Sequence, residues 1–354
     1  MKHNVNISKR QEEILSFVEQ KKFASVSEID VHLDKKGFRI AKVTVKRDLR
    51  NLIENQFLLT RGAGRSLVYV ISPQFNLKKN IDTNEYFSIS QDKRDALSGF
   101  NLEIFKVLEN VMFTEEEQKK LNDLHQEFLS NFNKIDSKTI LKKEFERILI
   151  EFSWKSSQIE GNTYSLLDTE ALLKEKKAAK GKTKEEAQMI LNHKIAFDFI
   201  LQKKTFLKNI SLAKIEKIHS MMIYNLGIQK NLRKIPVGII GTNYKPLDNQ
   251  YQIKEAILKI VQLINKKKDF FEKSFLILLL LSYTQAFEDG NKRTARMISN
   301  GILLSFGSTP ISYRAVDEVE YKKATILFYE QNNLSYFKEI FIKQYEFAVK
   351  NYFR

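Results

Sequence analysis

A polar string at residues 285–296 constrains the fold of this 354-residue chain more than any other feature, because it separates two strongly helical segments. An apolar run, 275–281, precedes it, and a helical pattern follows it to about Phe306, with Gly307 as the stop. A loop that carries Gly and Asn and then opens a helix turns its backbone N–H groups outward, and the helix dipole adds positive potential. The sequence therefore predicts a helix–loop–helix unit whose loop cradles phosphate.

Charged side chains within the string favour the same ligand. A guanidinium can bind phosphate through two N–H groups at once, and a lysine adds a point charge. The expected phosphate-binding residues are Gly290, Asn291, Lys292, Arg293 and Arg296. Asp289 supplies a hard oxygen ligand of the type that holds Mg²⁺ between phosphates. A surface turn with a solvated basic patch is the alternative interpretation of the string taken alone.

The string resembles the signature of the Fic (Fic/Doc) family, His-x-Phe-x-Asp/Glu-Gly-Asn-Gly/Lys-Arg with a second Arg three residues later. The matching residues are Phe287, Asp289, Gly290, Asn291, Lys292, Arg293 and Arg296. The resemblance implies a domain that binds ATP with Mg²⁺ and transfers AMP to Ser, Thr or Tyr hydroxyls of target proteins. Residues 231–249 resemble the family's β-hairpin flap, which pairs with the target polypeptide. The flap residues expected from this resemblance are Val237, Gly241, Thr242 and Tyr244.

A second motif lies upstream, at residues 156–162. It resembles the family's inhibitory helix, Ser/Thr-x-x-x-Glu-Gly/Asn, through Ser156, Glu160 and Gly161. The resemblance implies that Glu160 pairs with Arg296 and so occupies the space that the γ-phosphate of ATP requires. Without the signature, a Glu before a Gly at a helix end would be read as an ordinary solvated residue.

The family pattern breaks at its first position, where Gln285 stands in place of the histidine. That histidine deprotonates the target hydroxyl, and a positioned general base typically contributes about 10²–10⁴ in rate. An amide cannot take up the proton, so we expect nucleotide binding to survive and AMP transfer to be impaired. His193 or His219 could reach the site from another helix, although structural histidines are commoner. Lys292 is typical of the Doc group, which transfers the γ-phosphate, but that reaction also uses the missing histidine.

The first 75 residues carry a different pattern. Helical spacing predicts helices over about 8–21, 27–33 and 43–56, followed by two apolar strands around the turn 61–65. This order resembles the winged helix-turn-helix of bacterial repressors, in which the third helix enters the major groove and the wing contacts the DNA backbone. The DNA contacts implied are Lys42, Lys46, Arg50, Arg61 and Arg65. A winged helix that docks a protein is the alternative.

Composition bounds the remaining possibilities. The chain has no cysteine, which excludes disulfides and thiolate chemistry and suits the reducing cytoplasm. Its longest apolar run is far shorter than the roughly 20 residues of a membrane span, so we expect no membrane partner. The net charge of +16 favours an anionic partner, although a generally lysine-rich composition would give the same excess.

We therefore predict a mainly α fold. A winged helix of three helices plus a β-hairpin wing occupies residues 1–75, and a linker with a helical extension occupies 76–135. An all-α Fic domain, with its inhibitory helix and small β-hairpin flap, occupies 136–350. Two functions stay open: an ATP- and Mg²⁺-dependent AMP transferase with an impaired base, or a DNA-binding transcriptional regulator whose Fic domain senses nucleotide or binds a protein. Both kinds of domain commonly form homodimers.

Overall fold

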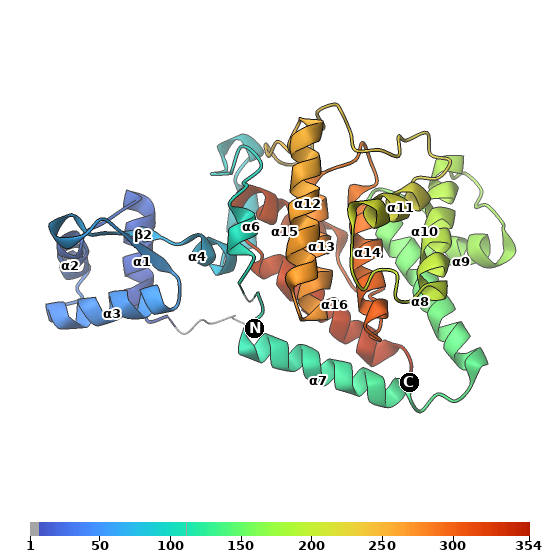
Figure 1. Ribbon diagram of the computed structural model, residues 1–354, viewed down its shortest axis with the longest axis horizontal. Helices are drawn as coiled ribbons and strands as arrows, with labels where there is room; N and C mark the ends of the chain where they lie inside the picture. The colour runs from blue at the N-terminus through green and yellow to red at the C-terminus, as the bar shows by residue number, and fades with distance from the viewer. Residues whose placement is uncertain (1–6, 111) are drawn as a thin grey trace. The chain divides into compact units, whose positions relative to one another are not determined.

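A computed structural model of the protein describes residues 7–110 and 112–354, except for the side chain of Arg65 (Figure 1). The described chain divides into two compact units. The N-terminal unit takes the residues up to 86 together with 331–335, and the C-terminal unit takes 87–330 and 336–354. None of the described helices has the length and apolar character that a membrane span requires.

The N-terminal unit begins with three helices and a two-stranded antiparallel sheet: α1 (Lys9–Lys21), α2 (Val26–Lys35), α3 (Lys42–Glu54), β1 (Leu58–Arg61) and β2 (Val68–Ile71). Ser8 and Ser25 begin α1 and α2 with capping boxes, in which each serine accepts from a backbone N–H one turn later. The core of this unit is mainly aliphatic, with Phe57 and Tyr69, and takes residues from the three helices and both strands. The predicted three helices and hairpin wing are confirmed.

Residues 73–84, which overlap the start of the predicted linker at 76–135, are partly helical. They contain α4 (Pro73–Lys78) and the start of α5 (Thr83–Ser88). Proline at the first helical position is already restricted to helical φ, and Ser72 caps the turn. The segment 331–335 holds α4 in place, because the Asn333 amide donates to the carbonyls of Asn76 and Lys79 at 2.9 and 2.7 Å. This long-range contact has no local sequence signal.

The C-terminal unit is built from helices. These are α6 (Ile104–Val107), α7 (Glu115–Phe132), α8 (Lys138–Ile159), α9 (Leu166–Glu175), α10 (Lys184–Gln202), α11 (Leu212–Met222), α12 (Gln250–Lys266), α13 (Phe270–Thr284), α14 (Asn291–Ser305), α15 (Glu318–Gln331) and α16 (Ser335–Asn351). Almost every side chain of α13 and α14 is buried, so these two helices form the centre of the unit (Figure 1). The loop that joins them therefore projects from a rigid base.

The predicted β-hairpin flap is not formed as strands. All of residues 231–249 are described, and they contain only an isolated parallel bridge between Lys245 and Gly99. The buried Arg233 guanidinium donates to the carbonyl oxygens of Gln285, Ile235 and Leu247. These bonds link both ends of the segment to the end of α13, and the segment between them runs as an irregular loop.

Candidate functional site

The loop between α13 and α14 is closed by two left-handed residues and one asparagine. Gln285 (φ 48°) ends α13 and Gly290 (φ 78°) precedes α14. A Cβ atom at Gly290 would approach Ile223 to 2.9 Å, so both conformation and space favour glycine there. The Asn291 side chain accepts from the N–H of Phe287 and donates to its carbonyl, both at 2.8 Å. The loop is therefore held in one shape without a ligand.

Gln285 is buried and its amide is fully engaged. Its Nε2 donates to the Ser282 carbonyl at 2.6 Å, and its Oε1 accepts from Asn291 Nδ2 at 3.2 Å. An amide nitrogen has no basic lone pair. The position at which the resemblance to the signature predicts a base is thus occupied by a fixed, neutral group.

The first turns of α14 carry two buried guanidinium groups. Arg293 Nη2 donates to Asp289 Oδ2 at 2.9 Å. Arg296 donates from Nε to Ser156 Oγ at 2.9 Å, and from Nη2 to Ser156 O and Glu160 Oε1 at 2.8 Å. The Nη1 atoms of both arginines are buried and have no hydrogen-bond partner among the described residues. Unsatisfied buried N–H groups are unfavourable, and both guanidinium groups are closed off from solvent.

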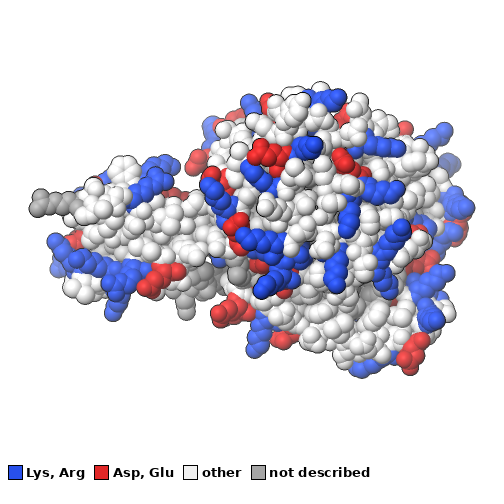
Figure 2. Space-filling view, in the orientation of Figure 1, with Lys and Arg blue, Asp and Glu red and all other residues white. Residues whose placement is uncertain are grey.

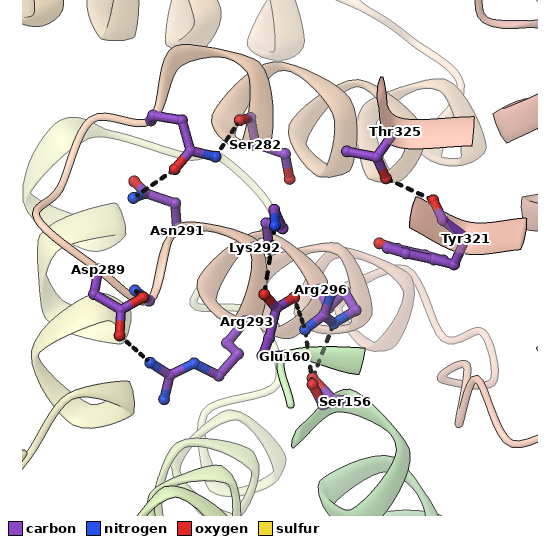
Figure 3. Close-up of polar contacts among 12 residues, drawn as sticks. Ser156, Glu160, Ser282, Asp289, Asn291, Lys292, Arg293, Arg296, Tyr321 and Thr325 are labelled. Atoms are coloured by element: carbon purple, nitrogen blue, oxygen red, sulfur yellow. Dashed lines mark hydrogen bonds and ion pairs between the residues drawn. The ribbon is translucent and has the colours of Figure 1, made fainter. Parts of the chain in front are cut away.

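Glu160 is held by two cations at the end of α8 (Figure 3). Its Oε1 lies 2.8 Å from Arg296 Nη2, and its Oε2 lies 3.5 Å from Lys292 Nζ. Burial alone would raise the pKa of Glu160, but the charges of Arg296 and Lys292 outweigh it and lower that pKa to about 2. The group is therefore a carboxylate at neutral pH. Gly161, at φ 97°, turns the chain away directly after it.

A cavity of about 420 Å³ opens beside these charges. One wall is polar and contains Glu160, Gln285, Asp289 and Lys292. The other wall combines residues 237–240 with one face of α15, including Tyr321, Thr325, Ile326 and Tyr329. This volume lies within the range of about 300–1,000 Å³ that is common for small-molecule sites. The α15 residues were missed at the sequence level, because no motif marks them and they lie far along the chain from the signature.

The remaining flap residues are divided between the cavity and its support. Val237 lines the cavity, whereas Gly241 turns the loop in a left-handed conformation. Thr242 accepts from the N–H of Tyr244 at 3.1 Å. Tyr244 is buried and donates its hydroxyl to the Tyr283 carbonyl at 2.8 Å, which anchors the loop to α13. The structure thus brings one of the four predicted flap residues into the cavity wall.

The donor set around Asp289 fits a magnesium ion that is bound mainly through phosphate. Its side chain lies at the cavity rim and accepts from Arg293. Within residues 7–110 and 112–354, no cluster of three or more His, Asp or Glu side chains could hold a metal by itself. Mg²⁺ commonly uses one or two carboxylates, with phosphate and water completing its shell.

His193 and His219 contact neighbouring groups of the fold. The His193 ring lies between the Met189 carbonyl and Ser156 Oγ, each at 2.9 Å, and mainly its burial lowers its pKa to about 3. His219 contacts the Asp289 carbonyl at 3.0 Å and stacks on Phe287, with 3.7 Å between the ring centroids. Neither ring is among the described residues that line the cavity.

The cations predicted to contact DNA lie on the surface of the N-terminal unit. The side chain of Lys42 is 77% exposed and its Nζ lies 3.9 Å from Asp30. Lys46, Arg50 and Arg61 are also exposed, and Figure 2 shows Lys and Arg side chains gathered over α3. The side chain of Arg65 lies outside the described part of the chain.

Sequence comparison matches a segment of each unit to a known family. Residues 209–303 match the Fic/DOC family, and residues 10–69 match the DeoR-like helix-turn-helix domain. Protein adenylyltransferase fic-1 of Caenorhabditis elegans is 25% identical over 213 residues, which cover 58% of this chain and 41% of that protein. Protein adenylyltransferase Fic of Aedes aegypti is 26% identical over 204 residues, which cover 55% and 40%. The matches thus span less than half the length of these relatives.

Solved structures with related folds carry the same family name. A Fic-1 fragment from C. elegans superposes with a TM-score of 0.58 at 23% identity, covering 67% of this chain and 72% of that chain. A Fic family protein from Desulfovibrio desulfuricans G20 gives a TM-score of 0.54 at 15% identity, covering 68% and 74%. At this level of identity, the superpositions show that the folds are alike.

Proposed function

The chain carries a Fic/DOC-family domain and a DeoR-like helix-turn-helix domain, and on this premise we propose that its Fic site binds ATP with Mg²⁺ but transfers AMP poorly. The observation that carries the proposal is the pair of buried guanidinium groups whose Nη1 atoms lack a partner among the described residues. Their positive charge and free N–H groups match the oxygens of a polyphosphate. Glu160 forms an ion pair with one of these guanidinium groups, that of Arg296, until a phosphate displaces it.

Each part of the nucleotide has residues suited to it. The triphosphate would contact the backbone of Gly290 and Asn291 and the cations of α14, and Asp289 would hold Mg²⁺. That ion would supply neutralising charge between the phosphates. The apolar and aromatic wall of the cavity, with Val237, Tyr321 and Tyr329, suits the nucleoside.

The impaired step is the proton transfer. In AMP transfer a target hydroxyl attacks the α-phosphorus, a new P–O bond forms, and pyrophosphate leaves. The hydroxyl proton must pass to a base, and Gln285 offers a neutral amide there. The relatives are named protein adenylyltransferases, which supports nucleotide binding by this chain. The neutral amide of Gln285 argues against efficient AMP transfer. If a target polypeptide docks, Ile240, 98% exposed beside the cavity, gives it an apolar contact.

Calorimetric titration of the full chain with ATP and Mg²⁺, paired with labelled-ATP incorporation, tests this proposal. We expect saturable binding that Arg293→Ala and Arg296→Ala weaken, with self-labelling near background. Absence of binding by the native chain and by Glu160→Gly would remove the nucleotide site. Strong labelling by the native chain would remove the claim of impairment.

A second function, DNA binding through the N-terminal unit, is favoured by the exposed cations of α3 and the wing. These side chains, described above for Lys42, Lys46, Arg50 and Arg61, suit phosphate contacts. The chain would then be a transcriptional regulator whose Fic domain senses nucleotide. Fluorescence anisotropy of the full chain with a labelled duplex, with and without ATP, tests both parts. Equal binding after neutralisation of the α3 cations would argue against it.

A further inference from the structure

The buried face of α3 defines which of its residues extend furthest from the unit. Val45, Leu49 and Leu52 are buried in the core. Successive residues of a helix are separated by about 100° around its axis. Val43 and Arg47 therefore lie opposite the core face, with Arg50 continuing the same stripe one turn later. Lys42 and Lys46 lie along one flank of that stripe.

Val43 is unusual because a large apolar side chain stands in the outermost position of a basic surface. It is 78% exposed, more than Phe23 or Val31 in the same unit. It lies in the first turn of α3, beside the exposed Lys42 and Lys46. The residue makes no contribution to the core there, and its apolar surface would be favourably covered by an apolar group of a ligand.

Arg47 stands one turn after Val43 on the same stripe. It forms no ion pair or hydrogen bond with a described residue. The next residue of α3, the buried Asp48, pairs with Arg10 and not with Arg47. As far as the described residues go, its guanidinium donors are available to a ligand. The DNA contacts expected from the sequence were Lys42, Lys46 and Arg50 on this helix and did not include Arg47.

We propose that Val43 and Arg47 read bases in the major groove: Val43 contacts a thymine methyl group and Arg47 contacts the O6 and N7 atoms of a guanine. Apolar side chains recognise the thymine methyl, and arginine recognises guanine through two hydrogen bonds. Four residues of helix rise about 6 Å, against about 3.4 Å per base pair. The thymine and the guanine therefore lie within about two base pairs of each other. This inference rests on the proposed DNA binding.

The flanking cations have a different task. Lys42 and Lys46 bind phosphate, so they contribute to every duplex regardless of sequence, and salt weakens their contribution. Val43 carries no charge, so its contribution depends on sequence and hardly on salt. This contrast separates base readers from phosphate contacts by experiment.

The test uses the full chain and a duplex enriched from a random pool by binding to it. Each thymine is replaced in turn by uracil, which lacks only the methyl group, and each guanine by 7-deazaguanine, which lacks N7. Affinities are measured by fluorescence anisotropy for the native chain, Val43→Ala and Arg47→Ala. Lys46→Ala is the matched control, because it changes an exposed residue of the same helix.

We expect one uracil substitution to weaken the native chain about fourfold, the size expected for one buried methyl, and to leave Val43→Ala unaffected. One 7-deazaguanine substitution should weaken the native chain about tenfold and leave Arg47→Ala unaffected. Lys46→Ala should weaken all duplexes alike and retain both sensitivities.

Two results overturn the inference, and they differ in what else they overturn. If Val43→Ala and Arg47→Ala keep the full base sensitivity of the native chain while binding stays dependent on salt, DNA binding stands and the base-reading assignment is wrong. If no duplex binds even at low salt, the proposed DNA binding and this inference both fail. Both residues are exposed, so circular dichroism melting should show an unchanged fold in the variants.

Discussion

The two units present their cations in opposite ways. In the C-terminal unit, Arg296 is fully buried, receives the Glu160 carboxylate, and is oriented by Ser156 before any ligand arrives. In the N-terminal unit, Lys42 is 77% exposed and its nearest carboxylate oxygen is 3.9 Å away. The buried cations are preorganised and already occupied, so a ligand must displace a carboxylate. The exposed ones are solvated, so a ligand must order them and release counterions.

The largest expected effect concerns the base of the buried site. In Gln285→His combined with Glu160→Gly, the Ser282 carbonyl that now accepts from the amide can accept from an imidazole N–H, which leaves the other ring nitrogen basic. We expect AMP transfer to rise by about 10²–10⁴ over Glu160→Gly alone. Incorporation of labelled AMP into protein measures it, with Gln285→Asn plus Glu160→Gly as the control that adds no base. No gain from the histidine would show that the cavity lacks more than a base.

The exposed cations should show the next largest effect, in their response to salt. With about five phosphate contacts, duplex affinity should fall by about 10²–10³ between 50 and 200 mM salt. Neutralising one contact, as in Lys46→Ala, should lower the slope of log affinity against log salt by about one. Anisotropy titrations over a salt series measure both. If the slope were unchanged in Lys46→Ala, Lys46 would not contact a phosphate in the complex.

ATP binding at the buried site should depend less on salt than DNA binding does, because buried charges are screened less. The comparison of the two slopes in one protein therefore separates a preorganised phosphate site from a solvated one. Equal slopes would mean that the Fic site opens widely before it binds.

The sequence predicted those parts of the fold and site that depend on local signals. Ser8 and Thr114 begin helices with capping boxes, a signal that is contained within four consecutive residues of the sequence. The loop before α14 was predictable because Gly290 and Asn291 determine its shape within a few residues. The contact of Lys292 with Glu160 and the cavity wall from α15 were not predictable, since they join distant segments. The flap was expected as strands by resemblance alone, and one buried side chain, Arg233, holds it as a loop.

Glu160→Gly tests whether the carboxylate competes with the γ-phosphate. It removes an ion pair with Arg296 and a second contact with Lys292, so ATP affinity should rise about tenfold, within the usual range of coupling between sites. ADP affinity should change much less, because ADP lacks the competing group. Calorimetry with both nucleotides measures this, and Glu160→Gln, which keeps the side-chain size, should fall between.

The ion pair of Glu160 with Arg296 also predicts that the effects of substituting these two residues on ATP affinity are non-additive. Arg296→Ala should weaken ATP binding and also erase the gain from Glu160→Gly, because both changes act through one contact. Equal shifts for ATP and ADP, or additive effects of the two substitutions, would show that Glu160 is an ordinary helix end.

The smallest effect is on stability in mild acid, and it comes from His193 behind the buried arginine. Burial lowers its pKa from 6.5 to about 3, with the charges of Arg293 and Arg296 contributing to the decrease. In the unfolded chain His193 therefore binds a proton near pH 6.5, whereas in the folded chain it stays neutral. The free energy of unfolding consequently falls as the pH drops below 6.5. The slope reaches at most about 1.4 kcal/mol per pH unit for one group.

Glu160 acts in a lower window, because its pKa is lowered from 4.5 to about 2 and its stabilising charge is lost only below pH 4.5. Burial also lowers the pKa of His125 and His219, so they share the upper window with His193. His193→Gln keeps an oxygen that can accept from Ser156 but cannot be protonated in this range. Urea unfolding at pH 7, 6 and 5 should therefore show a shallower loss of stability in His193→Gln than in the native chain. An identical slope would mean that His193 titrates normally, and that the buried cation site tolerates a further positive charge as readily as the exposed face of α3 does.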